Sequence, residues 1–243
     1  MAAPSRLTGV AREALVACRL FADMDDASLD LVAAALRPRR FRRGETIFHA
    51  GDPGDSLFIV GEGAVKITIP ADDGSEPAIL TTLGPGEFFG ELSLLDGAPR
   101  SATAVAIDAV EAQVLHRDAF DAVIDATPAV RRALLEALAG EIRRLTAQIE
   151  DFHFLDLPGR LARHLLRTLA TTSGLDVDDP LALIGERRVP WPFTQAELAG
   201  MIGGSRQSVN RLLAELVAAG IVRFEGDDLV IPDVARLADA VRR

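Results

Sequence analysis

The sequence predicts an α+β protein in which a β-barrel is followed by one long helix and then by a small helical domain that carries a β-hairpin. Short β-rich runs fill the region from Glu45 to Arg117, a regular apolar spacing runs through 128–154, and two short helices flank Gly203-Gly204. Of the 243 residues, 49% are hydrophobic and 26% charged, which is typical of a soluble folded chain. That length has room for one large domain or two ordinary ones.

Charge and cysteine content narrow the functional classes. The net charge of −10 argues against indiscriminate nucleic-acid binding, although residues 190–243 hold six Arg and seven acids and so carry only −1 of it. Cys18 is the only cysteine, so it can form no intramolecular disulfide and cannot hold an iron–sulfur cluster or a zinc ion unaided. No apolar run approaches the roughly 18 residues that a bilayer crossing needs. We expect a cytoplasmic protein without a membrane span.

The N-terminal part reads as one short helix followed by a small antiparallel sandwich or barrel. A helix is expected from Asp26 to Leu36 after a polar cap, and the basic stretch Arg37 to Arg43 follows it. Six β-rich runs come next, namely 46–48, 57–60, 64–69, 78–83, 103–107 and 112–115. Turn signals rich in glycine, proline and aspartate separate these runs, for example at 51–54, 61–63, 72–74 and 84–86, which is the spacing of an all-β domain.

One long helix is expected from Pro128 to about Phe154. Its apolar residues, Leu134, Leu138, Ile142, Leu145, Ile149 and Phe152, are spaced 4, 4, 3, 4 and 3 apart, as in a coiled-coil seam. A seam of this length needs a partner, so we expect a parallel homodimer; the alternative is a helix that packs on its own barrel. The predicted divisions are therefore a barrel domain (1–127), a dimerisation helix (128–156) and a C-terminal domain (157–243).

The C-terminal domain reads as three helices and a hairpin. Asp156 and Pro158-Gly159 form a hinge ahead of a helix over 161–169, and residues 173–180 form an acidic loop. Thr194 and Glu197 form a capping box for the second helix, which ends at the two glycines. The third helix starts at Ser205, and runs 221–224 and 229–231 flank a turn. This is the order of a winged helix-turn-helix.

The segment 86–93 (GEFFGELS) followed by Arg100-Ser101 resembles the phosphate-binding cassette of cyclic-nucleotide-binding domains. Backbone N–H groups near Gly90 and the Arg100 guanidinium can bind a cyclic phosphate, and the Glu91 carboxylate can accept a hydrogen bond from a ribose hydroxyl. The resemblance implies a ligand site made of Gly90, Glu91, Leu92, Arg100 and Ser101. The alternative is a glycine-rich barrel turn with an incidental Glu–Arg ion pair.

The resemblance extends from about Leu20 to the C-terminus. Segment 44–69, the 157–160 hinge and the Arg206-Gln207…Arg211 helix are similar to the cyclic AMP receptor protein and fumarate–nitrate regulator family of bacterial transcription factors. This implies a jelly-roll barrel, a homodimer, a palindromic double-stranded DNA site and RNA polymerase as a partner. It also implies that ligand bound in each barrel reorients the long helices and so sets the spacing of two recognition helices.

The third helix of the C-terminal domain carries the residues expected to read DNA. Arg206 and Arg211 suit the O6 and N7 edge of guanine, and Gln207 can face adenine. Phosphate contacts are expected from the hydroxyl side chains at the helix starts, Thr194, Ser205 and Ser208. Family members that recognise the best-known operator half-site carry Glu in place of Gln207, so the operator of this protein is expected to differ at that base pair.

Ligand choice is predicted less sharply than ligand class. The resemblance places an adjacent Thr-Ser pair against the adenine, whereas this chain has Leu145 and Thr146 there. Only the Thr146 hydroxyl can bond a purine, so cyclic AMP is expected with a modest preference over cyclic GMP.

No cofactor, metal site or enzymatic activity is expected. The four histidines, His49, His116, His153 and His164, are scattered, and the sequence contains no P-loop or nucleophile–base motif. Three hypotheses remain open. The first is a DNA-binding regulator controlled by a cyclic nucleotide, and the second is the same regulator with a vestigial nucleotide pocket. The third is a nucleotide-binding adaptor that acts through protein contacts.

Overall fold

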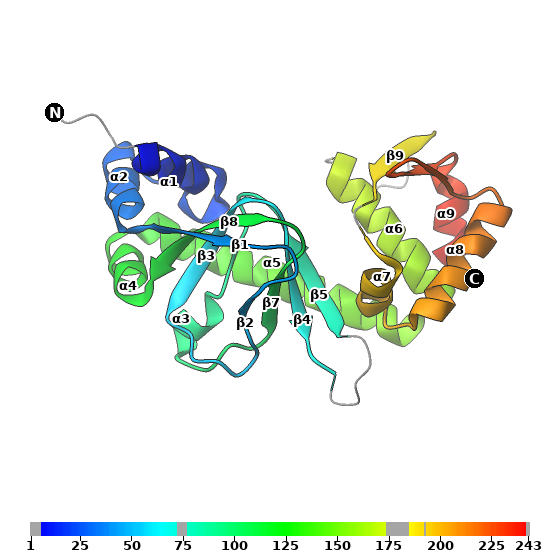
Figure 1. The fold of residues 1–243 in the computed structure, drawn as a ribbon, viewed down its shortest axis with the longest axis horizontal. Coiled ribbons are helices and arrows are strands. Elements are labelled where there is room, and N and C mark those ends of the chain that lie inside the picture. The colour runs from blue at the N-terminus through cyan, green and yellow to red at the C-terminus, as the bar shows by residue number, and fades with distance from the viewer. Residues whose placement is uncertain (1–5, 72–76, 174–184, 192, 242–243) are drawn as a thin grey trace. The chain divides into compact units, whose positions relative to one another are not determined.

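The computed structural model describes residues 6–71, 77–173, 185–191 and 193–241 (Figure 1). The chain divides into two compact units, Met1–Arg143 and Arg144–Arg243. Each unit has its own apolar core.

The first unit begins with helices that cover part of its core. These are α1 (Arg6–Ala17), the short 3-10 helix η1 (Arg19–Phe21) and α2 (Asp26–Ala35). The α2 helix agrees with the sequence prediction, and its polar cap is Asp25, whose carboxylate accepts a 2.8 Å hydrogen bond from the Ser28 N–H. The α1 helix was not predicted. Its buried residues Ala11, Ala14 and Leu15 repeat at helical spacing and join the same core as Phe21.

Two four-stranded antiparallel sheets follow, as expected for a jelly-roll barrel (Figure 1). One has the order β1-β8-β3-β6 and the other the order β2-β7-β4-β5. The strands are β1 (Arg37–Phe41), β2 (Thr46–Phe48), β3 (Ser56–Glu62), β4 (Val65–Ile69), β5 (Ala78–Leu83), β6 (Phe88–Phe89), β7 (Thr103–Ala106) and β8 (Val110–His116). Buried residues of both sheets, such as Val60 and Ala104, share one core.

Two of these strands were missed in the sequence. The first four residues of β1 are exposed and only Phe41 is buried, so this edge strand has no apolar alternation to reveal it. Pairing with β8, from Arg37 opposite Val114 to Phe41 opposite Val110, makes it a strand. The two-residue strand β6 pairs with β3 and is too short to show a period.

The helices α3 (Leu92–Asp96), α4 (Arg117–Ala126) and α5 (Pro128–Phe154) complete this part of the chain. The predicted bounds of the long helix are confirmed, but two predicted seam residues pack in the first unit instead. Leu134 is buried in the core of that unit, and the half-buried Leu138 packs against it. Leu135, Ile142 and Ile149, spaced seven residues apart, are instead 67%, 65% and 59% exposed. The first turns of α5 therefore pack on their own domain, as the alternative expected, while a heptad stripe remains exposed further along.

The second unit contains four described helices and a three-stranded sheet, rather than three helices and a hairpin. They are α6 (Leu157–Ser173), α7 (Gln195–Ile202), α8 (Arg206–Ala218) and α9 (Val234–Val241), with β9 (Arg187–Pro190), β10 (Arg223–Glu225) and β11 (Asp228–Ile231) in the order β10-β11-β9. The helix predicted over 161–169 begins earlier, because Asp156 caps it by accepting a 2.9 Å bond from the Gly159 N–H. Most of the expected 173–180 loop, and the 72–74 turn, lie outside the described residues.

Candidate functional site

The cassette predicted in the first unit forms a tight strand-to-helix turn. Strand β6 ends at Phe89, Gly90 has a φ of +87°, and α3 begins directly after Glu91. A Cβ atom on Gly90 would lie 2.7 Å from Nη1 of Arg100 and 3.0 Å from the carbonyl oxygen of Ser56. Glycine is therefore needed here both for its left-handed backbone and for this close approach.

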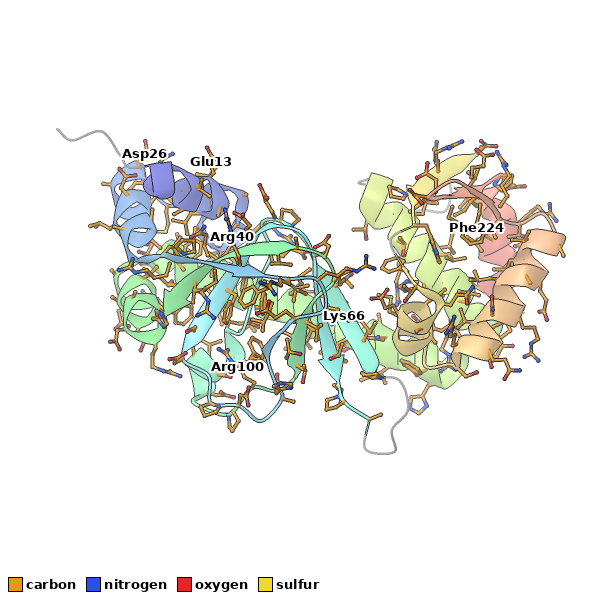
Figure 2. All side chains as sticks on the ribbon, in the orientation of Figure 1. Glu13, Asp26, Arg40, Lys66, Arg100 and Phe224 are labelled. Carbon is orange, nitrogen blue, oxygen red and sulfur yellow. The ribbon has the colours of Figure 1, made fainter. Side chains whose placement is uncertain are left out.

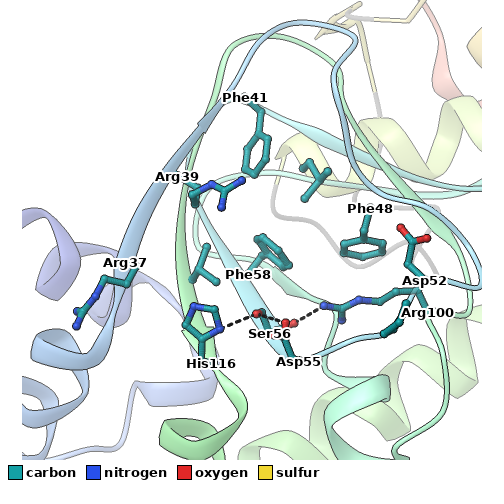
Figure 3. Close-up of a pocket in the computed structure, with 13 residues that line it drawn as sticks. Arg37, Arg39, Phe41, Phe48, Asp52, Asp55, Ser56, Phe58, Arg100 and His116 are labelled. Carbon is teal, nitrogen blue, oxygen red and sulfur yellow. Dashed lines mark hydrogen bonds between the residues drawn. The ribbon is translucent and has the colours of Figure 1, made fainter.

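Arg100 is buried against this turn, with only 6% of its surface exposed (Figures 2 and 3). Its Nη1 donates a 2.6 Å hydrogen bond to the Gly90 carbonyl, and its Nη2 donates a 2.8 Å bond to the Ser56 carbonyl. The guanidinium carbon lies 4.3 Å from the ring centre of Phe48. Burial lowers the pKa of Arg100, although nearby Asp55 opposes this shift. The side chain thus braces two backbone carbonyls at the cassette.

Glu91 lies at the same turn in an environment that disfavours its charge. Burial is the main cause that raises the pKa of its carboxyl, and the Glu141 carboxylate of α5 raises it further, while Arg100 acts in the opposite direction. Glu91 and Arg100 form no ion pair within 4.0 Å, which is not what the incidental-pair alternative expected. Glu141 was not identified from the sequence. It lies three residues after Leu138, which packs on the core of the first unit, so both side chains lie on the same face of α5.

The remaining residues of the predicted ligand site are less enclosed. Leu92 is 43% exposed at the first turn of α3, and Ser101 is exposed directly after Arg100. Thr146 is an exposed residue of α5 that belongs to the second unit. The structure therefore brings Gly90, Glu91 and Arg100 together.

The second unit contains the predicted pair of short helices. The Thr194 hydroxyl accepts a 3.2 Å bond from the Glu197 N–H, and the Glu197 carboxylate accepts a 3.0 Å bond from the Thr194 N–H, so the capping box is confirmed. Gly203 ends α7 with a φ of +67°, and Ser205 caps α8 by accepting a 3.1 Å bond from the Ser208 N–H.

One face of α8 is buried and the opposite face is exposed. Val209, Leu212 and Leu213 are buried in the core of the second unit. On the other side of the helix the predicted readout residues Arg206, Gln207 and Arg211 are exposed, together with Asn210. Arg211 lies 3.8 Å from the Glu215 carboxylate, whereas Arg206 makes no ion pair within the described part of the chain.

The glycine turn between α7 and α8 is also a packing point. A Cβ atom on Gly203 would lie 2.4 Å from the ring of Phe152, near the end of α5. A Cβ atom on Gly204 would lie 2.9 Å from the side chain of Leu157, at the start of α6. The turn can approach these side chains only because both positions lack a side chain.

Ion pairs connect side chains in and beside the three-stranded sheet. Arg188 pairs with Glu225 and, at 3.3 Å, with Asp228. Arg223 pairs with Glu225 at 2.7 Å and with Glu186 at 3.1 Å. Phe224, labelled in Figure 2, packs edge-on to Trp191 with 5.8 Å between ring centres. Arg188 and Arg223 are thus already matched by carboxylates.

Within the described residues no three His, Cys, Asp or Glu side chains gather closely enough to hold a metal ion. Among the helices that the structure describes, none combines the length and the apolar character needed to cross a bilayer.

Comparison with known proteins matches both halves of the chain. A family model described as a cyclic nucleotide-binding domain matches residues 38–127, and one described as a Crp-like helix-turn-helix domain matches residues 159–240. The chain is 38% identical over 230 residues to the CRP-like cAMP-activated global transcriptional regulator of Mycobacterium tuberculosis, with 95% of this chain and 99% of that protein covered. It is 32% identical to the cyclic AMP receptor protein of Thermus thermophilus, with 90% and 95% covered.

Solved structures agree on the fold. FixK2 from Bradyrhizobium japonicum aligns with a TM-score of 0.70 at 23% identity, covering 84% of this chain and 96% of that one. Because both halves match in this order and the curated relatives span nearly the whole chain, the protein belongs to the CRP/FNR family of transcription regulators.

Proposed function

We propose that the protein is a homodimer that binds a two-fold symmetric DNA site and that a cyclic nucleotide, cyclic AMP before cyclic GMP, controls this binding. The observation that carries the proposal is the joint presence of the Gly90–Glu91–Arg100 cluster and an exposed polar face on α8. The Mycobacterium relative is described as cAMP-activated. A regulator of this kind acts in the cytoplasm, contacts RNA polymerase and catalyses no reaction.

The nucleotide part of the proposal rests on the chemistry of the cassette. The Glu91 carboxylate would accept a hydrogen bond from the ribose hydroxyl, and the Ser101 hydroxyl and the N–H groups of the turn at Gly90 and Leu92 would bind the cyclic phosphate. Arg100 would supply the positive charge beside that phosphate while it braces the turn. Thr146 would give the purine one hydroxyl, so the preference for cyclic AMP is expected to be modest, about 0.5–1.5 kcal/mol.

Titration calorimetry with both nucleotides tests this part. We expect binding to the unmodified protein, loss of binding in Arg100→Ala, and a narrowed preference in Thr146→Ala. Arg117→Ala is the matched control, because Arg117 also donates to backbone carbonyls, those of Gly54, Ser93 and Leu94. Equal loss in both arginine variants, with equal changes in melting temperature, would make the role of Arg100 structural. No heat with either nucleotide in the unmodified protein would contradict the nucleotide proposal.

One observation favours the second candidate, a DNA-binding regulator with a vestigial nucleotide pocket. Both Nη atoms of Arg100 are committed to backbone carbonyls, and the Glu141 carboxylate opposes the charge on Glu91. If the calorimetry shows no nucleotide binding while DNA binding persists, this candidate replaces the first.

The DNA part of the proposal rests on α8 and α5. Arg206, Gln207 and Arg211 are exposed together, as groups that read base edges must be. The hydroxyls of Thr194, Ser205 and Ser208 already serve as caps or bond one another, so they would share their hydrogen bonds with phosphate. The exposed heptad stripe of α5 supplies a parallel dimer contact that relates two copies of α8 by a two-fold axis.

Gel-shift experiments test the DNA part. Half-site centres are expected about one helical turn, roughly 34 Å, apart, so inserting five base pairs between them should abolish specific binding. Arg206→Ala and Arg211→Ala should each relax discrimination at one guanine by about 1–3 kcal/mol, while Arg236→Ala, an exposed arginine of α9, should not. Unchanged affinity for the lengthened probe would contradict the dimeric docking. The absence of duplex binding would favour the adaptor hypothesis.

A further inference from the structure

The first unit contains a cavity that lies apart from most of the cassette residues. Its volume is about 390 Å³, in the lower part of the size range of small-molecule sites. Its walls come from β1, β2, β3, β8 and the turn after β2 (Figure 3), and β1 and β2 each form one edge of their sheet. Gly90, Glu91 and Ser101 do not line it, whereas Arg100 does.

The floor of this cavity is apolar and aromatic. The ring of Phe58 lies 6.4 Å from that of Phe41 and 5.8 Å from that of Phe48, measured between centres, and Ile47 and Val114 complete the surface. A planar or aliphatic group can lose its water against such a floor. The cation that would suit these ring faces is already present, because the Arg100 guanidinium lies over Phe48.

The acidic groups of the cavity are also satisfied from within. The Ser56 hydroxyl donates a 2.7 Å bond to the Asp55 carboxylate and so must accept the 3.0 Å bond from Nδ1 of His116 (Figure 3). The Asp52 carboxylate accepts a 2.8 Å bond from the His49 N–H. The bond to Ser56 lowers the pKa of Asp55, and the charges of His116 and Arg100 contribute, so this carboxylate stays ionised and matched.

The rim has the opposite character. Arg37 and Arg39 are exposed on β1, and neither makes an ion pair within the described ranges. Arg37 donates to the carbonyls of Ala34 and Leu36, while the Arg39 guanidinium lies 5.7 Å from the ring centre of Phe41. The Arg37 guanidinium is directed away from the cavity towards the end of α2 (Figure 3), so the Arg39 guanidinium is the one on β1 that borders the aromatic floor, and it has no acidic partner among the residues that the structure describes. An incoming carboxylate would supply that partner.

We infer that this cavity is a second ligand site, which takes a small amphipathic carboxylate with its aromatic or alkyl part on the phenylalanine floor and its carboxylate against Arg39. Binding at this site does not depend on the proposed nucleotide control. A second consequence does rest on it. Phe48 and Arg100 belong both to the cavity wall and to the support of the cassette, so a ligand that moves them changes nucleotide affinity, and the nucleotide changes carboxylate affinity by the same factor.

Calorimetry of the full chain with three probes of one shape tests the site. We expect 1-naphthoate to bind once per chain, 1-naphthylmethanol to bind on the order of tenfold more weakly, and 1-naphthylmethylamine to give no heat. Arg39→Gln should weaken naphthoate binding by a similar factor. Arg42→Gln is the matched control, since Arg42 is exposed just beyond β1 but does not line the cavity. Ile47→Phe, which fills the cavity, should abolish binding without removing a charge.

The calorimetry distinguishes the second ligand site from its linkage to the cassette. No heat from naphthoate, equal affinity for all three probes, or equal loss in Arg39→Gln and Arg42→Gln would overturn the site. Naphthoate binding that leaves cyclic AMP affinity unchanged would overturn the linkage. Naphthoate binding to a chain that binds no cyclic nucleotide would support the site and contradict the proposed nucleotide control.

Discussion

The exposed stripe of α5 gives a quantitative expectation for dimer strength. Ile142 is 65% exposed in the single chain, and full burial of such a side chain stabilises by about 1.5–3 kcal/mol. Burying the exposed two thirds contributes about 1–2 kcal/mol per copy. A symmetric dimer contains two copies, and alanine keeps a small part of the contact. Ile142→Ala should therefore weaken the dimer by about 2–3 kcal/mol, which raises the dissociation constant roughly 30- to 150-fold.

Sedimentation equilibrium over a range of protein concentrations measures this change. Leu135→Ala and Ile149→Ala, in the same heptad stripe, should show shifts of similar size. Leu31→Ala is the matched control, because Leu31 of α2 is 76% exposed and lies outside the stripe. Leu134→Ala should instead lower the free energy of unfolding, by about 2–5 kcal/mol, since Leu134 is packed in the core of its own unit. If Ile142→Ala dissociates no more readily than Leu31→Ala, the stripe is not the dimer contact.

Three further predictions concern protonation and capping. The Glu91 carboxyl must be ionised to accept a hydrogen bond from the ribose hydroxyl, and its pKa is raised, so nucleotide affinity should rise with pH. Glu141→Gln removes one cause of the raised pKa and should move this rise to lower pH in calorimetric titrations. Burial lowers the pKa of His164 from 6.5 to about 4, so the folded protein keeps this ring neutral and has its full stability above pH 6.5. As the pH falls from 6.5 towards 4, the free energy of unfolding should decrease by about 3 kcal/mol. Urea unfolding of His164→Leu should lack this decrease. Thr194→Ala should lower the unfolding free energy by about 1 kcal/mol, whereas Thr171→Ala, which removes an exposed hydroxyl within α6, should change it far less; equal losses would contradict the capping role.

Features that depend on neighbouring residues in the chain were predictable from the sequence. The capping box of Thr194 and Glu197 and the glycine stop at Gly203 are local, and the bounds of α5 follow from Pro128 at its start and from its apolar spacing. Features that depend on distant partners were not. The edge strand β1 forms because it pairs with β8, and the short strand β9 forms because it pairs with β11.

The candidate site divides in the same way. The order Gly90, Glu91, Arg100 was visible as a motif, because its spacing is fixed along the chain. The commitment of Arg100 to the Ser56 carbonyl was not, since those residues are 44 positions apart. The distinction between Leu134 and Leu135 also escaped the pattern. Both fit an apolar stripe, and only the packing of the first unit decides which of them faces inward.

The contact between Phe152 and the turn at Gly203 has a genetic consequence. The ring of Phe152 is 44% exposed on α5 and also fills the space that a side chain on Gly203 would need. A screen for defective variants should therefore return alleles at Phe152 and Gly203 that impair assembly and DNA binding together. Alleles at Ile142 should impair assembly first, and alleles at Arg206 should impair DNA binding alone. A smaller side chain at Phe152 should rescue Gly203→Ala only in part, because that backbone also requires a positive φ.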